Sequence, residues 1–173
     1  WEWGHRFFGR MIGLVAVAGF AFFAIRRWLT KRLTWHLVAL IGLGGLQGAI
    51  GWWMVASGIG ETTRVDVAPY RLMTHFTLAL LIIAYVAWLW HDLGAKARPM
   101  VPDMARTVAV LLLVAIFLQM AAGALVAGLD AGRSYNDWPL MAGEVIPSHY
   151  LEDGLSVRSL FEGRAATQFN HRL

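Results

Sequence analysis

Histidine is the residue type through which this sequence can do chemistry. Its 173 residues include six histidines and no cysteine, so disulfides, thiolate metal sites and thiol nucleophiles are excluded. No glycine-rich phosphate loop, zinc motif or Ser/His/Asp arrangement accompanies the histidines. Neutral imidazoles bind transition metals and heme iron. Ligation is therefore the chemistry to expect wherever the fold brings two imidazoles together.

Long apolar helices must position these histidines. Hydrophobic residues make up 58% of the chain and charged residues 15%, and the mean hydropathy is +0.54. Four stretches contain no Asp, Glu, Lys or Arg, namely 11–25, 33–60, 72–91 and 107–129. A helix of about 20 residues spans a bilayer core of ~30 Å. The composition excludes a soluble globular domain, a disordered chain and a nucleic-acid binder, and predicts an all-α integral membrane protein.

The placement of charge predicts the orientation of these helices. Segments 26–32 and 92–106 together hold seven basic residues against two acidic ones. Basic residues concentrate on the cytoplasmic side of membrane proteins, so we expect both segments to face inward. Segments 1–10, 61–71 and 130–172 then lie on the outer side. The net charge of +4 is accordingly assigned to the membrane surface and not to a nucleic-acid partner.

Turn and cap signals between the apolar stretches divide the chain into elements. We expect four complete transmembrane helices, over 2–28, 34–57, 69–92 and 104–129. A fifth helix begins near Ala165 and is truncated. Segment 130–164 contains Trp138-Pro139 and Pro147, and we expect it to form an ordered outer cap. The sequence begins at Trp1 and ends without a terminal pattern, which indicates a fragment of a longer chain.

The topology gives the histidines two different depths. His5 and His75 fall in the first turns of two helices that run inward, so they share the outer level. His36 and His91 lie near the inner ends, because the 16 residues from His75 to His91 cover about 24 Å of helix. His149 is expected to be a solvated loop residue. Imidazoles of His5 and His75 within about 10 Å of each other could hold one six-coordinate heme iron. Alternatively, the two are merely hydrogen-bonded at the membrane interface.

Charged residues beside His5 offer further chemistry. Glu2 precedes His5 by three residues, so both project from one face of a helix. Its carboxylate could take a proton or stabilise a developing cation, or it could simply favour the helix N-terminus. Arg6 could pair with heme propionates or lipid headgroups. Weaker candidates at the same level are Arg10, Tyr70, Arg71, Trp52 and Trp53.

Two short sequences recur along the chain. LQGAIG at 46–51 returns as LQMAAG at 118–123, and EWGHR at 2–6 returns as QFNHR at 168–172. The second recurrence places His171 and Arg172 at the start of a helix, as His5 and Arg6 are. We therefore expect two homologous halves. Residues 1–103 would supply three helices of the first four-helix half, and 104–173 the first helix, the cap and the start of the second helix of the other half.

Several motifs, in order along nearly the whole chain, resemble the heme A synthase family. They are EWGHR at 2–6, QGAIGWWMV at 47–55, YRLMTH at 70–75, AGLDAG at 127–132, NDWPLM at 136–141 and QFNHRL at 168–173. The chain looks closest to the cysteine-free mitochondrial and proteobacterial branch. The resemblance implies eight transmembrane helices in two related four-helix halves, a two-fold pseudo-repeat. It also implies oxidation of a ring methyl of heme O to the formyl group of heme A, which is inserted into cytochrome oxidase.

Carried over residue by residue, the resemblance implies roles for four positions. His5 and His75 would flank the substrate heme O, with Glu2 as the acidic residue of that site, and His171 would be the first ligand of a heme b. Arg6 and Arg172, which directly follow their histidines, are cofactor-binding candidates that could pair with heme propionates or with lipid headgroups. The other heme b ligand would lie beyond Leu173, so we expect this fragment alone to be inactive.

The same resemblance implies the surroundings of the protein. Heme O synthase would supply the substrate, an electron donor of unknown identity would act on the protein, and a homo-oligomer is compatible. A bacterial plasma membrane is favoured over the mitochondrial inner membrane. Two alternatives remain: a diheme membrane cytochrome b that transfers electrons from quinol, and a membrane scaffold without heme.

Overall fold

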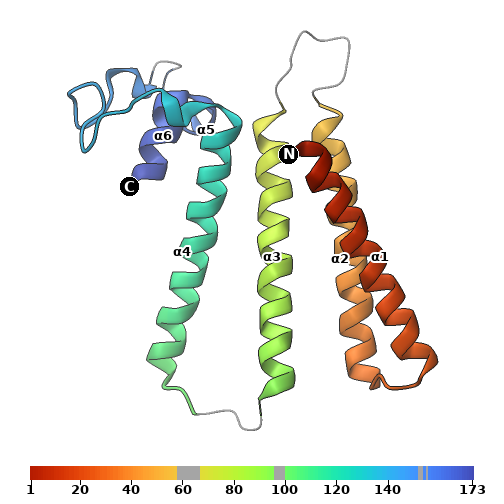
Figure 1. The fold of residues 1–173 in the computed structure, drawn as a ribbon. Helices are drawn as coiled ribbons and strands as arrows, with labels where there is room; N and C mark the ends of the chain where they lie inside the picture. Colours follow the sequence, from red (N-terminus) through yellow and green to blue (C-terminus); the bar gives the residue numbers. More distant parts are fainter. Residues whose placement is uncertain (58–66, 96–99, 152–153, 155) are drawn as a thin grey trace.

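Four long antiparallel helices form the body of the molecule (Figure 1). The computed structural model describes residues 1–57, 67–95, 100–151, 154 and 156–173. The helices are α1 Glu2–Ile25, α2 Lys31–Val55, α3 Pro69–Gly94 and α4 Asp103–Gly128. Each is long and apolar enough to cross a membrane, and the described residues contain no β-strand. The predicted all-helical fold with four membrane spans is confirmed, whereas the eight-helix architecture and its division at residue 103 stay predictions.

The first helical connection differs from its prediction. Helix α1 ends at Ile25, three residues before the expected Trp28, because Arg27 adopts a positive φ of 56°. Helix α2 begins at Lys31, ahead of the expected Thr34, because the Thr30 side chain accepts a hydrogen bond from Leu33 N at 3.3 Å. Such a cap satisfies an otherwise free N–H group at the helix start. A basic residue in a left-handed conformation has no reliable sequence signal.

Apolar side chains cover the outside of the four helices. Of the described residues in these helices, the buried ones are Leu89, Ala124 and Leu125. Exposed Leu, Ile, Val and Phe side chains suit a bundle whose solvent is lipid. The end of α4 packs tightly against the start of α3. A Cβ on Gly128 would lie 2.8 Å from Pro69 Cα, so glycine is required there.

The segment after α4 folds over one end of the bundle (Figure 1). It contains η1 Ala131–Arg133, η2 Ser148–Leu151, α5 Val157–Glu162 and α6 Arg164–Arg172. Ala131, Met141 and Ala166 are fully or almost fully buried within it. The predicted ordered cap and the predicted short helix near Ala165 are both confirmed for the described residues. We call the end of the bundle that carries this segment the cap end.

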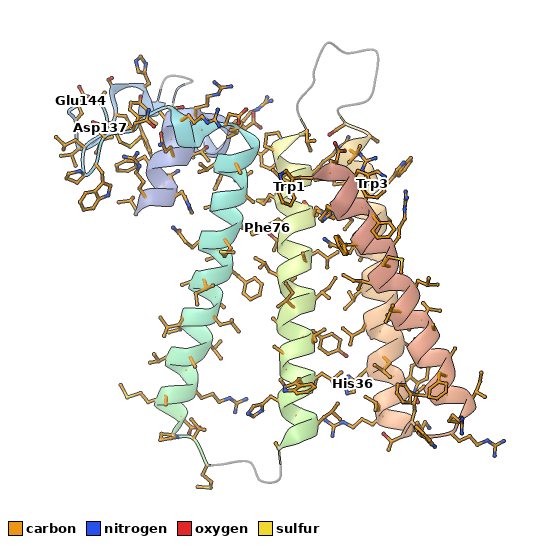
Figure 2. All side chains as sticks on the ribbon, viewed as in Figure 1. Trp1, Trp3, His36, Phe76, Asp137 and Glu144 are labelled. Carbon is orange, nitrogen blue, oxygen red and sulfur yellow. The ribbon has the colours of Figure 1, made fainter. Side chains whose placement is uncertain are left out.

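The opposite end, which we call the basic end, carries the connections rich in Arg and Lys. Arg32 forms an ion pair with Asp92 at 2.5 Å. His36 Nδ1 lies 2.7 Å from the Tyr85 hydroxyl. Figure 2 shows Trp1 and Trp3 near the cap end and His36 toward the basic end. The structure thus separates His36 from the outer histidines as expected, while the assignment of the basic end to the cytoplasm stays a prediction.

Candidate functional site

His5 and His75 come together at the cap end from α1 and α3. Their ring centroids are 6.4 Å apart and their planes make an angle of 72°. An imidazole nitrogen binds a transition metal at about 2 Å, so two trans imidazoles on one iron have ring centres about 6 Å apart. The predicted proximity is confirmed, and the spacing fits a single iron between the rings. His5 is exposed and His75 is half-buried.

Helix α2 holds His75 in place through a glutamine and a glycine. Gln47 Nε2 donates to the backbone oxygen of His75 at 3.0 Å, and it lies 3.2 Å from Nδ1 and 3.3 Å from Nε2 of the ring. A Cβ on Gly51 would lie 2.9 Å from His75 Cε1, so the ring rests against the α2 backbone. We call α1, α2 and α3 at this level the first histidine region.

His171 lies in a second histidine region, formed by α4 and α6. Gln119 Nε2 donates to the backbone oxygen of His171 at 2.6 Å. A Cβ on Gly123 would lie 2.9 Å from His171 Cε1. Nδ1 of His171 is buried and has no hydrogen-bond partner among the described residues. Because Nδ1 is covered by protein, a heme iron at this place would be bound by the other ring nitrogen, Nε2.

The charged residues of the first region pair with each other. The Glu2 carboxylate forms an ion pair with the guanidinium of Arg6, one helical turn away. The side chains of Glu2 and Arg6 are 74% and 47% exposed, so this pair is weakly held and both groups remain accessible. Sequence analysis expected Arg6 to contact propionates or headgroups and did not foresee Glu2 as its partner.

Arg172 is occupied by the cap. Its guanidinium donates to the backbone oxygens of Tyr135 at 2.7 Å, Asp137 at 2.9 Å and Leu140 at 3.3 Å. The loop that carries these carbonyls follows η1, and α6 is thereby tied to it. Sequence analysis expected a heme or lipid contact for Arg172 and missed this role, because the cap loop is distant in sequence.

The weaker candidates of the first region mostly serve packing. Arg71 donates to the backbone oxygen of Trp53 at 2.8 Å, and its guanidinium lies 4.5 Å from the centroid of the Trp53 ring. This cation–π contact ties the start of α3 to the end of α2. The Tyr70 hydroxyl donates to Glu162 at 3.3 Å and so connects α3 to the cap. Trp52 and Arg10 are exposed.

Gln47, Gly51, Gln119 and Gly123 are the residues that sequence analysis missed. Their signal was the recurrence of LQGAIG as LQMAAG. Within the described part of the chain, no group of three or more His, Asp or Glu could hold a bare metal ion. Heme needs only one or two protein ligands because the porphyrin supplies four.

A cavity of about 600 Å³ lies in the cap and is lined in part by Tyr135, His149 and Arg164. None of the six predicted site residues lines it. We therefore place the candidate chemistry at the histidine regions, where the geometry of the imidazoles supports ligation.

The fold and the histidine geometry define a polytopic all-α membrane protein with two imidazoles close together at one end of its helices. The family model described as cytochrome oxidase assembly protein matches residues 1–173, and the chain belongs to this family. Relatives named heme A synthase match over the full chain, with 73% identity in Hyphomonas neptunium, 49% in Caulobacter vibrioides and 46% in Roseobacter denitrificans.

The chain spans about half the length of these curated relatives, 49%, 50% and 47% respectively. No solved structure matches the chain. The predicted resemblance to the heme A synthase family is confirmed, and the alternative of an electron-transferring cytochrome b is not favoured.

Proposed function

We propose that the full-length protein is a heme A synthase, an integral membrane oxidoreductase that converts one ring methyl of heme O into a formyl group. The observation that carries this proposal is the 6.4 Å spacing of the His5 and His75 rings at the cap end. Membership in the cytochrome oxidase assembly family and relatives named heme A synthase support it. We place the protein in a bacterial plasma membrane, because these relatives come from bacteria and four helices are long and apolar enough to cross a membrane.

In the first histidine region, His5 and His75 hold the substrate by its iron from two helices. Fixed imidazoles convert an encounter between substrate and oxidant into a reaction at one defined methyl carbon. Two successive hydroxylations of that carbon would give a geminal diol, which loses water to form the aldehyde. In each hydroxylation one dioxygen would give one oxygen atom to a C–H bond, and its second atom would leave as water after taking two electrons and two protons. Glu2 lies on the same face of α1 as His5, one turn earlier, and its carboxylate takes up or holds a proton beside the methyl group.

In the second histidine region, His171 would hold a heme b. When bound, heme b would supply electrons to the first region one at a time. Arg172 fixes the cap around His171 through its bonds to backbone oxygens. Heme O synthase is the proposed supplier of substrate, and the activity belongs to the full-length protein.

The test is heme extraction from membranes of cells that make the full-length protein together with a source of heme O. Wild-type membranes should yield heme A. His75→Ala should abolish heme A and lose the substrate heme. His91→Ala is the matched control, because His91 is an exposed residue at the basic end of the same helix and should leave heme A unchanged. Membranes that yield heme b alone from the wild-type protein would show an electron-transfer protein instead.

A further inference from the structure

We infer that Gln47 with Gly51, and Gln119 with Gly123, are two copies of one device that positions a heme-binding histidine. This inference rests on the proposed function. In each copy a glutamine amide donates to the backbone oxygen of the histidine, at 3.0 Å for His75 and 2.6 Å for His171.

A glycine one turn after each glutamine completes the device. The four-residue spacing places the glutamine and the glycine on one face of their helix. A Cβ at Gly51 or Gly123 would lie 2.9 Å from Cε1 of the neighbouring imidazole. Real Cβ atoms essentially never approach so closely, so any larger residue must displace the ring. The two copies therefore agree in both of their contacts.

Each contact controls a different degree of freedom of the histidine. The backbone oxygen of His75 lies inside α3 and has a second lone pair, so it can accept the amide in addition to its helical bond, whereas the oxygen of His171 lies in the last turn of α6. This amide bond fixes the height of the histidine relative to the neighbouring helix, and in a membrane a polar side chain gains from finding such a partner. The bare glycine backbone leaves room for the Cε1 edge of the ring to approach the helix and so restricts which way the ring faces. A ligand held in both respects needs little reorganisation when iron binds.

The positions of the two copies in the chain also indicate a repeat unit that is smaller than a four-helix half. In each copy, the helix with glutamine and glycine precedes the histidine helix that packs against it: α2 precedes α3, and α4 precedes α6. The LQGAIG recurrence relates α2 to α4, whereas the EWGHR recurrence relates α1 to α6. Both recurrences are explained if each four-helix half consists of two helix pairs. In each pair the first helix carries the glutamine and the glycine, and the second helix carries the histidine. The helix pair is thus the unit that presents one histidine.

The experiment uses the full-length protein in membranes of cells supplied with heme O. The readouts are the reduced-minus-oxidised optical spectrum and the low-spin electron paramagnetic resonance signals of each heme. Gly51→Ala should shift the signals of the substrate heme alone, and Gly123→Ala those of heme b alone. Gly48→Ala is the matched control, because a Cβ there meets nothing within 4 Å, and it should leave both signals unchanged.

Gln47→Met and Gln119→Met test the amide without adding bulk. Methionine keeps the length of the side chain and removes the donor. Loss of an outer-shell partner weakens ligation by about 10- to 100-fold, so each variant should retain its own heme about 10-fold less tightly and the other heme normally. These variants also cover the case in which a glycine substitution prevents accumulation of the protein.

The outcomes separate this inference from the proposed function. Retention of the substrate heme in His75→Ala would overturn the proposed site itself. Loss of heme in His75→Ala together with wild-type signals in Gly51→Ala and Gln47→Met would overturn the positioning device alone. Equal changes at both hemes in Gly51→Ala or in Gly123→Ala would show a general packing defect, which also overturns the device.

Discussion

The two histidine regions hold their imidazoles alike but use the neighbouring polar residues differently. In the first region, Glu2 and Arg6 form an exposed ion pair beside His5. In the second region, the corresponding residues of the recurring sequence are Gln168 and Arg172, and both bind backbone atoms of the cap. Gln168 is 5% exposed. It accepts from Tyr135 N at 3.1 Å and donates to Tyr135 O at 2.8 Å.

This difference matches the two proposed roles. A region that oxidises a substrate needs an acid or base that solvent and substrate can reach, and an exposed carboxylate provides one. A region that only holds an electron-transferring heme benefits from rigidity, and buried hydrogen bonds to the backbone provide it. The same recurring sequence thus makes an exposed ion pair in the first region and buried backbone hydrogen bonds in the second.

Removal of one histidine from each region should have the largest effect. His5→Ala should lose the substrate heme and lower heme A formation by more than about 100-fold, since even outer-shell losses reach that size, while heme b is retained. His171→Ala should lose heme b and keep the substrate heme. Quantification of the extracted hemes measures both. Loss of both hemes in either variant would contradict the independence of the two regions.

The next largest effects on heme A formation and on cap stability are expected when Glu2 and Gln168 each receive the residue type of the other region. Glu2→Gln should leave heme binding intact but slow heme A formation by about 100-fold, because a general acid or base contributes roughly that much. Gln168→Glu should instead destabilise the cap by about 2 kcal/mol, because a carboxylate cannot donate to the backbone oxygens of Gly132 and Tyr135.

Heme A yield measures the first variant, and hydrogen exchange of the η1 amides measures the second. Glu2→Asp is the control that keeps the charge and should retain part of the activity. An unchanged heme A yield in Glu2→Gln would return Glu2 to a role at the helix N-terminus. Unchanged exchange in Gln168→Glu would contradict the structural role of this side chain.

Removal of Arg6 or of Arg172 should have smaller effects on stability, and these effects should still differ between the two regions. Arg172→Ala removes three hydrogen bonds to cap carbonyls and should destabilise the cap by about 2 kcal/mol. Arg6→Ala breaks an exposed ion pair and should cost less than about 1 kcal/mol. Hydrogen exchange in α6 and limited proteolysis of the cap should detect the first change and not the second. Equal effects of Arg172→Ala and Arg6→Ala would contradict the difference between the structural role of Arg172 and the exposed ion pair of Arg6.

The sequence was sufficient for the helices and for the shared level of His5 and His75. Uncharged stretches of membrane length and the alternation of direction place both histidines at one level, whereas the rotation of α1 and α3 that turns the two rings toward each other comes from the tertiary structure. The role of Gly51 was hidden, because small residues spaced along membrane helices usually mark helix packing. The partners of Arg172 were hidden for another reason. They are carbonyls of an irregular loop, whose path depends on the folded cap and not on any periodic pattern.

The smallest expected effect concerns pH and lies within the cap loop that Arg172 holds. Hydrogen bonds from the backbone N–H groups of Ala142 and Gly143 lower the pKa of Asp137 below its ordinary value of 3.8, and Arg172 contributes in the same direction. Gly143 N donates to Asp137 Oδ2 at 3.1 Å. A carboxyl whose pKa is lower in the folded state adds stability that is complete above its unfolded pKa.

This stability is lost as the pH falls through the folded pKa, and Asp137 is exposed, so the loss should be confined to the loop. We expect the Gly143 amide to exchange faster once the pH drops below the ordinary aspartate range, after correction for intrinsic exchange. Asp137→Asn should abolish this pH dependence and leave the η1 amides unaffected. Protection at Gly143 that does not change with pH in the wild-type protein would show that the carboxylate does not order the loop. The order of this loop would then rest on other contacts, those of Gln168 and Arg172 among them, which makes the contrast with the exposed Glu2–Arg6 pair sharper.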